Sequence, residues 1–124
     1  MRLLLDANIV LWALERPERL NPAVLATMQD STNELFVSTA TLLEITSKAA
    51  SGRLTFDDES RAKVTALAAW LPVEANHSWR VRNLPPIHKD PFDRIIVAQA
   101  LEEGMTLVTG DRLLMEYGVP ILLT

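Results

Sequence analysis

Residues 1–12 read MRLLLDANIVLW, and one acidic residue interrupts this otherwise apolar stretch. Residues 3–5 (LLL) are typical of a buried strand, and residues 8–15 (NIVLWALE) predict a short helix. Asp6 therefore stands where the first strand meets the first helix. An aspartate there is either a helix N-cap, which contributes about 1 kcal/mol, or a functional carboxylate at a strand end. Both interpretations stay open, because Asn8 can serve as the cap instead.

The rest of the chain repeats this alternation of strand and helix. Further strands are expected at 33–38 (NELFVS), 71–74 (LPVE), 105–109 (MTLVT) and 119–124 (VPILLT). Helices are expected over 22–31, 39–52, 55–70, 76–84 and 90–104, with a short one inside 110–118. Such alternation predicts an α/β fold with a mostly parallel sheet covered on both faces. We expect one domain spanning residues 1–124.

The composition narrows the class of protein. Hydrophobic residues make up 48% and charged residues 23%, which is typical of a globular protein. The absence of cysteine excludes a disulfide framework and a thiolate metal site. Neither a signal-peptide pattern nor a membrane-spanning apolar run is present, so a cytoplasmic location is expected. The net charge of −4 argues against binding nucleic acid by phosphate contacts alone, but not against an enzyme that holds phosphate through metal.

Polar residues follow three of the expected strands. In α/β sheets ligands bind outside the carboxyl ends of the strands. Asp6 follows the first strand, Ser38 ends the second, and Thr109 and Asp111 lie at the end of the fourth. Asp111 stands beside a glycine, so an ordinary turn is an alternative explanation for it.

The helix over 90–104 contributes two more acids. Asp90 and Pro91 are typical of an N-cap and a first helical position. Asp93 then lies in the first turn, where it can interact with the helix dipole. However, it also shares a face with the apolar residues Ile96, Val97 and Ala100. That placement directs Asp93 toward the end of the sheet and slightly favours a functional role.

Other polar and aromatic residues give weaker signals. Glu44 and Lys48 are four apart on one helix face, and the pattern favours a solvated ion pair. His77 and His88 lie in unrelated contexts, so neither a histidine-based triad nor a zinc site is expected. The tryptophans are expected to pack in the protein and not to stack on bases; they are Trp12, Trp70 and Trp79.

Four stretches together resemble one known family. They are LLLDANIVLW (3–12), ELFVSTATLLEIT (34–46), HKDPFDRIIVAQA (88–100) and TLVTGDRLL (106–114). Their order and spacing resemble the PIN-domain ribonucleases, and above all the VapC-type toxins of bacterial toxin–antitoxin pairs. The resemblance implies a three-layer α/β/α sandwich with a central, mostly parallel sheet of four to five strands.

The resemblance also implies a catalytic and metal-binding quartet. It maps onto Asp6, Glu44, Asp93 and Asp111, and it thereby favours a functional Glu44 over the ion-pair interpretation. Four residues are expected to support the quartet: Asn8, Ser38, Asp90 and Thr109. Family members commonly carry a hydroxyl residue after the first aspartate, where this chain has Ala7. We expect Ala7 to cost one supporting hydrogen bond and not the metal site.

The expected activity follows from the same resemblance. Converging carboxylates suit Mg²⁺ or Mn²⁺, which can activate water for hydrolysis of RNA. A rim of basic residues is expected to meet the phosphates; it comprises Lys48, Arg53, Lys89, Arg94 and Arg112. The family further implies a cognate antitoxin, which covers the site and inserts a basic side chain, and a homodimer.

Two alternatives stay open. A phosphotransferase of the haloacid-dehalogenase or receiver type also places an aspartate after its first strand. Asn8 stands where such a phosphatase needs a second aspartate, and no lysine follows the strand before Asp111 as a receiver requires. The other alternative is a catalytically silent PIN-like domain that only binds a protein.

Overall fold

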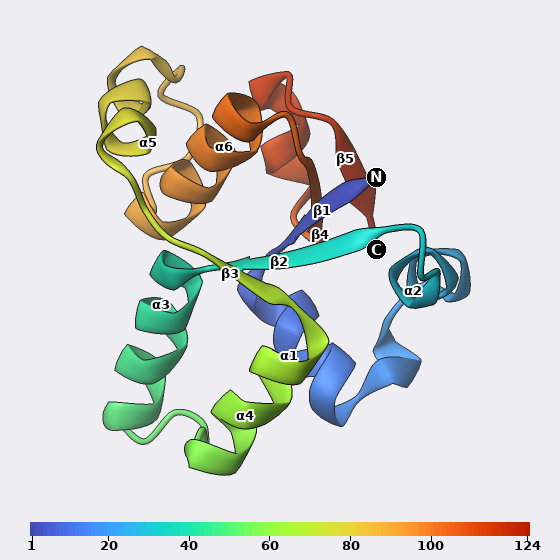
Figure 1. The fold of residues 1–124 in the computed structure, drawn as a ribbon. Helices are drawn as coiled ribbons and strands as arrows, with labels where there is room; N and C mark the ends of the chain where they lie inside the picture. The colour runs from blue at the N-terminus through green and yellow to red at the C-terminus, as the bar shows by residue number, and fades with distance from the viewer.

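A five-stranded, fully parallel sheet forms the centre of the computed structural model, which describes residues 1–124 (Figure 1). The strand order is β3-β2-β1-β4-β5. The strands are β1 (Arg2–Leu5), β2 (Glu34–Ser38), β3 (Ala69–Leu71), β4 (Thr106–Thr109) and β5 (Ile121–Leu123). The first strand of the chain therefore lies in the middle, where Leu3 aligns with Leu35 of β2 and with Thr106 of β4.

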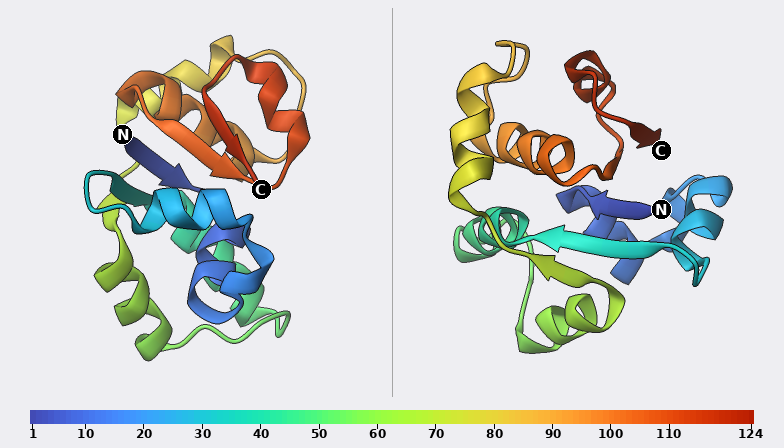
Figure 2. Two further views of the ribbon diagram at one scale, coloured as in Figure 1. Left: turned by 90° about the vertical axis from the view of Figure 1, so that its right-hand side faces the viewer. Right: turned by 45° about the horizontal axis from the view of Figure 1, so that its top comes forward.

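Helices cover both faces of the sheet. Figure 1 shows α5 and α6 on one side and α1 and α4 on the other, and Figure 2 shows the same layers from two further directions. The α-helices are α1 (Ala7–Glu15), α2 (Pro22–Gln29), α3 (Thr39–Ala50), α4 (Asp58–Leu67), α5 (Ala75–Arg80) and α6 (Pro91–Glu103). Short 3₁₀ helices are η1 (Pro17–Arg19), η2 (Val81–Asn83) and η3 (Arg112–Tyr117). This arrangement confirms the predicted three-layer α/β/α sandwich.

The three leucines of β1 join two apolar cores. Leu3 and Leu5 belong to the core shared with α1, α2, α3 and α4, while Leu4 belongs to the core under α6 and η3. Side chains alternate between the faces of a strand, so one short run serves both layers. All three are fully buried, and burial of each such side chain stabilises the fold by about 1.5–3 kcal/mol. The carboxyl end of β1 is therefore held firmly.

The third strand differs from its prediction. The helix expected over 55–70 ends at Leu67, and the strand expected at 71–74 occupies Ala69–Leu71. Pro72 follows directly, and a proline has no N–H to donate to a sheet. Pairing with β2 decides the register, because Val37 aligns with Trp70 and Ser38 with Leu71.

Other helix limits agree closely with the sequence. Asn21 caps α2 and Asp90 caps α6, each followed by proline at the first helical position. Gly104 ends α6 at φ 65°, a left-handed conformation that favours glycine. The expectation that every tryptophan packs is wrong for Trp79, whose side chain is exposed and stacks with Arg82. No helix is long and apolar enough to cross a bilayer.

Candidate metal centre

An acidic depression lies at the carboxyl end of the sheet. It has a volume of about 430 Å³ and is bordered by segments that are far apart in the sequence. Its lining residues are Asp6, Ala7, Asn8, Trp12, Glu44, Asp90, Asp93, Gly110 and Asp111. The fold therefore brings together all four acids of the predicted quartet, together with Asn8 and Asp90.

Asp6 is both the N-cap of α1 and a wall of this depression. Its Oδ1 accepts the N–H of Ala7 at 2.7 Å, and its Oδ2 accepts the hydroxyl of Thr109 at 2.7 Å. Asn8, the alternative cap considered from the sequence, is therefore not the cap, since it is the second residue of α1 and is exposed. Burial raises the pKa of Asp6, and the hydrogen bond from Thr109 opposes that rise.

Asp93 lies in the first turn of α6, as predicted. Asp90 accepts the N–H of Phe92 at 2.9 Å and so caps the helix, which leaves the Asp93 carboxylate free of the cap. The buried face behind it consists of Ile96, Val97 and Ala100. Burial, and then repulsion from Asp6 and Asp90, raise the pKa of Asp93 to about 7. Without a cation this site therefore holds a carboxyl that resists ionisation.

Glu44 reaches the depression from α3. The hydroxyl of Ser38 begins that helix by accepting the N–H of Ala40 at 3.0 Å, and Ser38 itself is fully buried. The predicted ion pair exists, with Lys48 Nζ at 3.0 Å from Glu44 Oε2. Its surroundings differ from the solvated pair expected, because the Glu44 side chain is only 13% exposed. Lys48 thus partly offsets the negative charge of the depression.

Asp111 and Gly110 form the turn after β4. The N–H of Asp111 donates to the Thr109 hydroxyl at 3.1 Å, and Asp111 Oδ1 accepts the N–H of Leu113 at 3.0 Å. Thr109 therefore ties Asp6 and the Asp111 backbone together. A Cβ at Gly110 would lie 3.2 Å from the backbone oxygen of Thr124, so the close approach of the two segments favours glycine there.

His88 also belongs to this centre, although the sequence pattern did not indicate it. Its Nε2 lies 3.2 Å from Asp93 Oδ2 and 3.1 Å from Asp111 Oδ2. The available signal was its position two residues before the Asp90 cap, which places the loop beside the start of α6. His77 is different: it is fully buried and contacts Glu103 at 2.7 Å, away from the quartet.

The comparison with known families agrees with this geometry. The sequence model of the PIN domain matches residues 3–119. The chain belongs to the PIN-domain family. Ribonuclease VapC22 of Mycobacterium tuberculosis (strain ATCC 25618 / H37Rv) is 28% identical to this PIN domain over 128 residues. The alignment covers 94% of this chain and 92% of that protein.

Solved structures show the same fold. This PIN domain is similar to VapBC2 from Rickettsia felis bound to a promoter DNA fragment, with a TM-score of 0.76 at 16% identity. It is also similar to DNA-bound VapBC from Salmonella typhimurium, with a TM-score of 0.72 at 16% identity. The first alignment covers 99% of this chain and 98% of the other, and the second covers 98% and 97%.

The acidic centre of this PIN domain fits a divalent cation. Several carboxylates converge, and the pKa values of Asp6 and Asp93 are raised because their charges are buried or lie close together. Hard divalent cations prefer carboxylate oxygens and relieve such repulsion. In addition, one side-chain nitrogen of His88 and one carboxylate oxygen each from Asp93 and Asp111 lie within 4.8 Å of one another.

The five basic residues predicted for the rim differ in how free they are. Arg53, Lys89 and Arg112 are exposed, and Lys48 pairs with Glu44. Arg94 does not support the prediction, because its guanidinium is hydrogen-bonded to backbone carbonyls of the preceding loop. The two shortest of these bonds reach Pro85 at 2.9 Å and Val81 at 3.1 Å.

Proposed function

We propose that this PIN domain is a metal-dependent endoribonuclease and the toxin of a toxin–antitoxin pair. The observation that carries the proposal is the convergence of Asp6, Glu44, Asp93 and Asp111 in one open depression. The relationship to a VapC ribonuclease supports RNA as the substrate. Family membership and the acidic centre favour this function over the phosphotransferase alternative.

The quartet would hold Mg²⁺ or Mn²⁺. When bound, the ion supplies Lewis-acid activation of water and stabilises charge that develops on the phosphate. Asp6 is well suited as a ligand because Thr109 and the Ala7 N–H fix its orientation. Asp93 approaches from α6, and because Asp90 caps that helix, the Asp93 carboxylate is not used by the cap and can face the ion.

The remaining residues would position the RNA. The exposed residues Arg53, Lys89 and Arg112, together with Lys48, would meet phosphates that flank the cleaved one. Water adds to phosphorus as the bond to O3′ breaks, and O3′ receives a proton. The products are therefore a 5′-phosphate and a 3′-hydroxyl, as the family resemblance implies.

Two partners follow from the same proposal. The similar Rickettsia and Salmonella proteins are VapBC complexes, which supports a cognate antitoxin for this chain. An antitoxin would inhibit by inserting a basic side chain among the acids of the depression, where the charge is complementary. A homodimer is proposed from the family resemblance.

Cleavage of defined RNAs tests the activity. Purified protein is incubated with labelled RNA in Mg²⁺, in Mn²⁺ and in EDTA. We expect cleavage with either metal and none in EDTA, and Asp6→Asn should lose about 1,000-fold in rate, since a catalytic ion supplies several kcal/mol. Glu116→Gln, an exposed acid outside the depression, is the matched control. Cleavage that persists in EDTA, or survives Asp6→Asn, contradicts the mechanism; loss in Glu116→Gln as well would point to a general defect.

A further inference from the structure

We propose that His88 is a positioning residue, which hydrogen-bonds Asp93 and Asp111 and so fixes the orientation of both carboxylates toward the cation. This inference rests on the proposed function, because it assumes that the depression binds a metal. The resemblance to PIN domains gave roles to the four acids and to their supporting residues, and it assigned none to His88.

The first support is the bridging geometry. His88 Nε2 lies almost equally far from the two carboxylates, at 3.2 Å from Asp93 Oδ2 and 3.1 Å from Asp111 Oδ2. Asp93 belongs to α6, whereas Asp111 follows β4. One imidazole therefore connects two separate elements that each carry a predicted ligand.

The second support is the hydrogen bond at the other ring nitrogen. The backbone N–H of Asp90 donates to His88 Nδ1 at 3.3 Å. A neutral imidazole that accepts at Nδ1 carries its hydrogen on Nε2. Nε2 is then a donor, and its N–H is shared between the two carboxylate oxygens. This arrangement favours a hydrogen-bonding role over direct ligation, which would need a free lone pair on Nε2.

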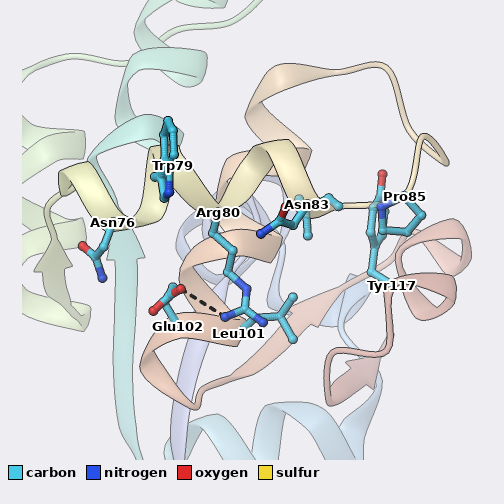
Figure 3. A pocket seen from close by; sticks show the side chains of 9 residues that line it. Asn76, Trp79, Arg80, Asn83, Pro85, Leu101, Glu102 and Tyr117 are labelled. Atoms are coloured by element: carbon cyan, nitrogen blue, oxygen red, sulfur yellow. Dashed lines mark hydrogen bonds and ion pairs between the residues drawn. The ribbon is translucent and has the colours of Figure 1, made fainter.

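The third support is the way the fold anchors the loop. The N–H of His88 donates to the hydroxyl of Tyr117 at 2.7 Å, and Arg94 donates to the Pro85 oxygen at 2.9 Å. Figure 3 shows Tyr117 beside Pro85, where η3 meets this loop. Tyr117 is almost fully buried. The loop backbone that carries His88 is therefore held by contacts from η3 and α6 outside the acidic depression.

His88 restrains the predicted metal ligands Asp111 and Asp93 through their carboxylate oxygens. Leu113 donates to Asp111 Oδ1 and His88 contacts Asp111 Oδ2, so both oxygens of this partly exposed carboxylate are held. Each oxygen keeps a second lone pair for the ion. Loss of the imidazole would release one side of Asp111 and remove a partner from Asp93. Removal of such a supporting hydrogen bond typically weakens metal affinity by about 10- to 100-fold.

Titration with Mn²⁺ tests this role without any RNA. The free-ion signal in electron paramagnetic resonance gives the Mn²⁺ affinity of the wild type, His88→Ala and His88→Gln. We expect His88→Ala to bind Mn²⁺ about 10- to 100-fold more weakly. His88→Gln places an amide N–H near the position of Nε2 and should restore the affinity to within about threefold, since it keeps the donor.

A folding check, a second variant and a spectroscopic measurement complete the test of His88. Circular dichroism checks that each variant folds. If His88→Ala does not fold, Tyr117→Phe, which removes the acceptor of the His88 N–H, should still weaken Mn²⁺ binding measurably. Pulsed electron paramagnetic resonance of bound Mn²⁺ should show no coupling to an imidazole nitrogen directly on the ion.

The contrary outcomes are distinct. An unchanged affinity in the folded His88→Ala protein overturns the proposal. A tighter affinity also overturns it, because the imidazole would then compete with the cation. A nitrogen coupling to Mn²⁺ that disappears in His88→Ala would make His88 a ligand, which overturns the positioning role. If the wild type binds Mn²⁺ but cleaves no RNA, the proposed function fails while the affinity comparison still decides the role of His88.

Discussion

Replacement of Asp93 by asparagine should stabilise the metal-free protein at alkaline pH. Burial, followed by the charge of Asp6, raises the pKa of Asp93 from 3.8 to about 7. The unfolded chain ionises this group near its ordinary value, so between about pH 4 and pH 7 the folded protein retains a proton that the unfolded chain has lost. The free energy of unfolding therefore falls as the pH rises through that interval, and the loss is complete above pH 7.

The magnitude follows from the size of the shift. A rise of about three units corresponds to at most about 4 kcal/mol. The Asp93 side chain is 15% exposed and borders an open depression, so screening by water reduces the effect to about 1–3 kcal/mol. Asparagine cannot ionise, and Asp90 still caps α6 in the variant. At pH 8, Asp93→Asn should therefore melt about 3–10 °C above the wild type, whereas near pH 4 the two should melt together.

Thermal unfolding in EDTA, followed by circular dichroism at several pH values between 4 and 8.5, measures this difference. Glu116→Gln is the matched control and should leave the pH dependence of the wild type unchanged, because Glu116 is exposed and outside the depression. A loss of stability at pH 8 in Asp93→Asn would mean that the helix dipole outweighs repulsion at this position. A difference that does not vary with pH would equally refute the assignment of the effect to ionisation.

Two further predictions concern the metal and the loop. Mn²⁺ or Mg²⁺ at about 100 times its dissociation constant should stabilise the wild type by about 2.7 kcal/mol. Scanning calorimetry should show that Asp6→Asn loses most of this stabilisation. An equal stabilisation of the wild type and of Asp6→Asn would exclude Asp6 as a ligand. Arg94→Lys should lower the free energy of unfolding by about 2–4 kcal/mol, because a lysine cannot reproduce the hydrogen bonds to Val81 and Pro85. A urea midpoint of Arg94→Lys equal to that of the wild type would instead show that the hydrogen bonds of Arg94 do not stabilise the fold.

Much of the fold could be predicted because its signals are local. Three consecutive leucines at the start of the chain indicate a central strand, and Asp90 with Pro91 marks the start of α6. The third strand could not be placed correctly, because no local pattern separates residues 69–71 from the helix before them. Its position depends on pairing with β2, in which Val37 aligns with Trp70.

In the site, too, some residues could be predicted from local sequence signals, whereas others depended on tertiary packing. The carboxylates at the ends of β1 and β4 could be found because a parallel sheet places such ends at one edge. Glu44 was indicated only by resemblance, since its helical spacing to Lys48 is also that of an ordinary surface pair. Its low exposure depends on how α3 packs beside the depression.

The sequence by itself determined the order of strands and helices, the apolar core strand and the acids that could bind a metal. Only the tertiary structure decided that Asp6 accepts a hydrogen bond from Thr109, 103 residues away, and that His88 lies between Asp93 and Asp111. The physical reason is the range of each interaction. Hydrophobic periodicity and helix caps act over a few residues, whereas the meeting of side chains depends on the register of distant strands and on the loops anchored against them.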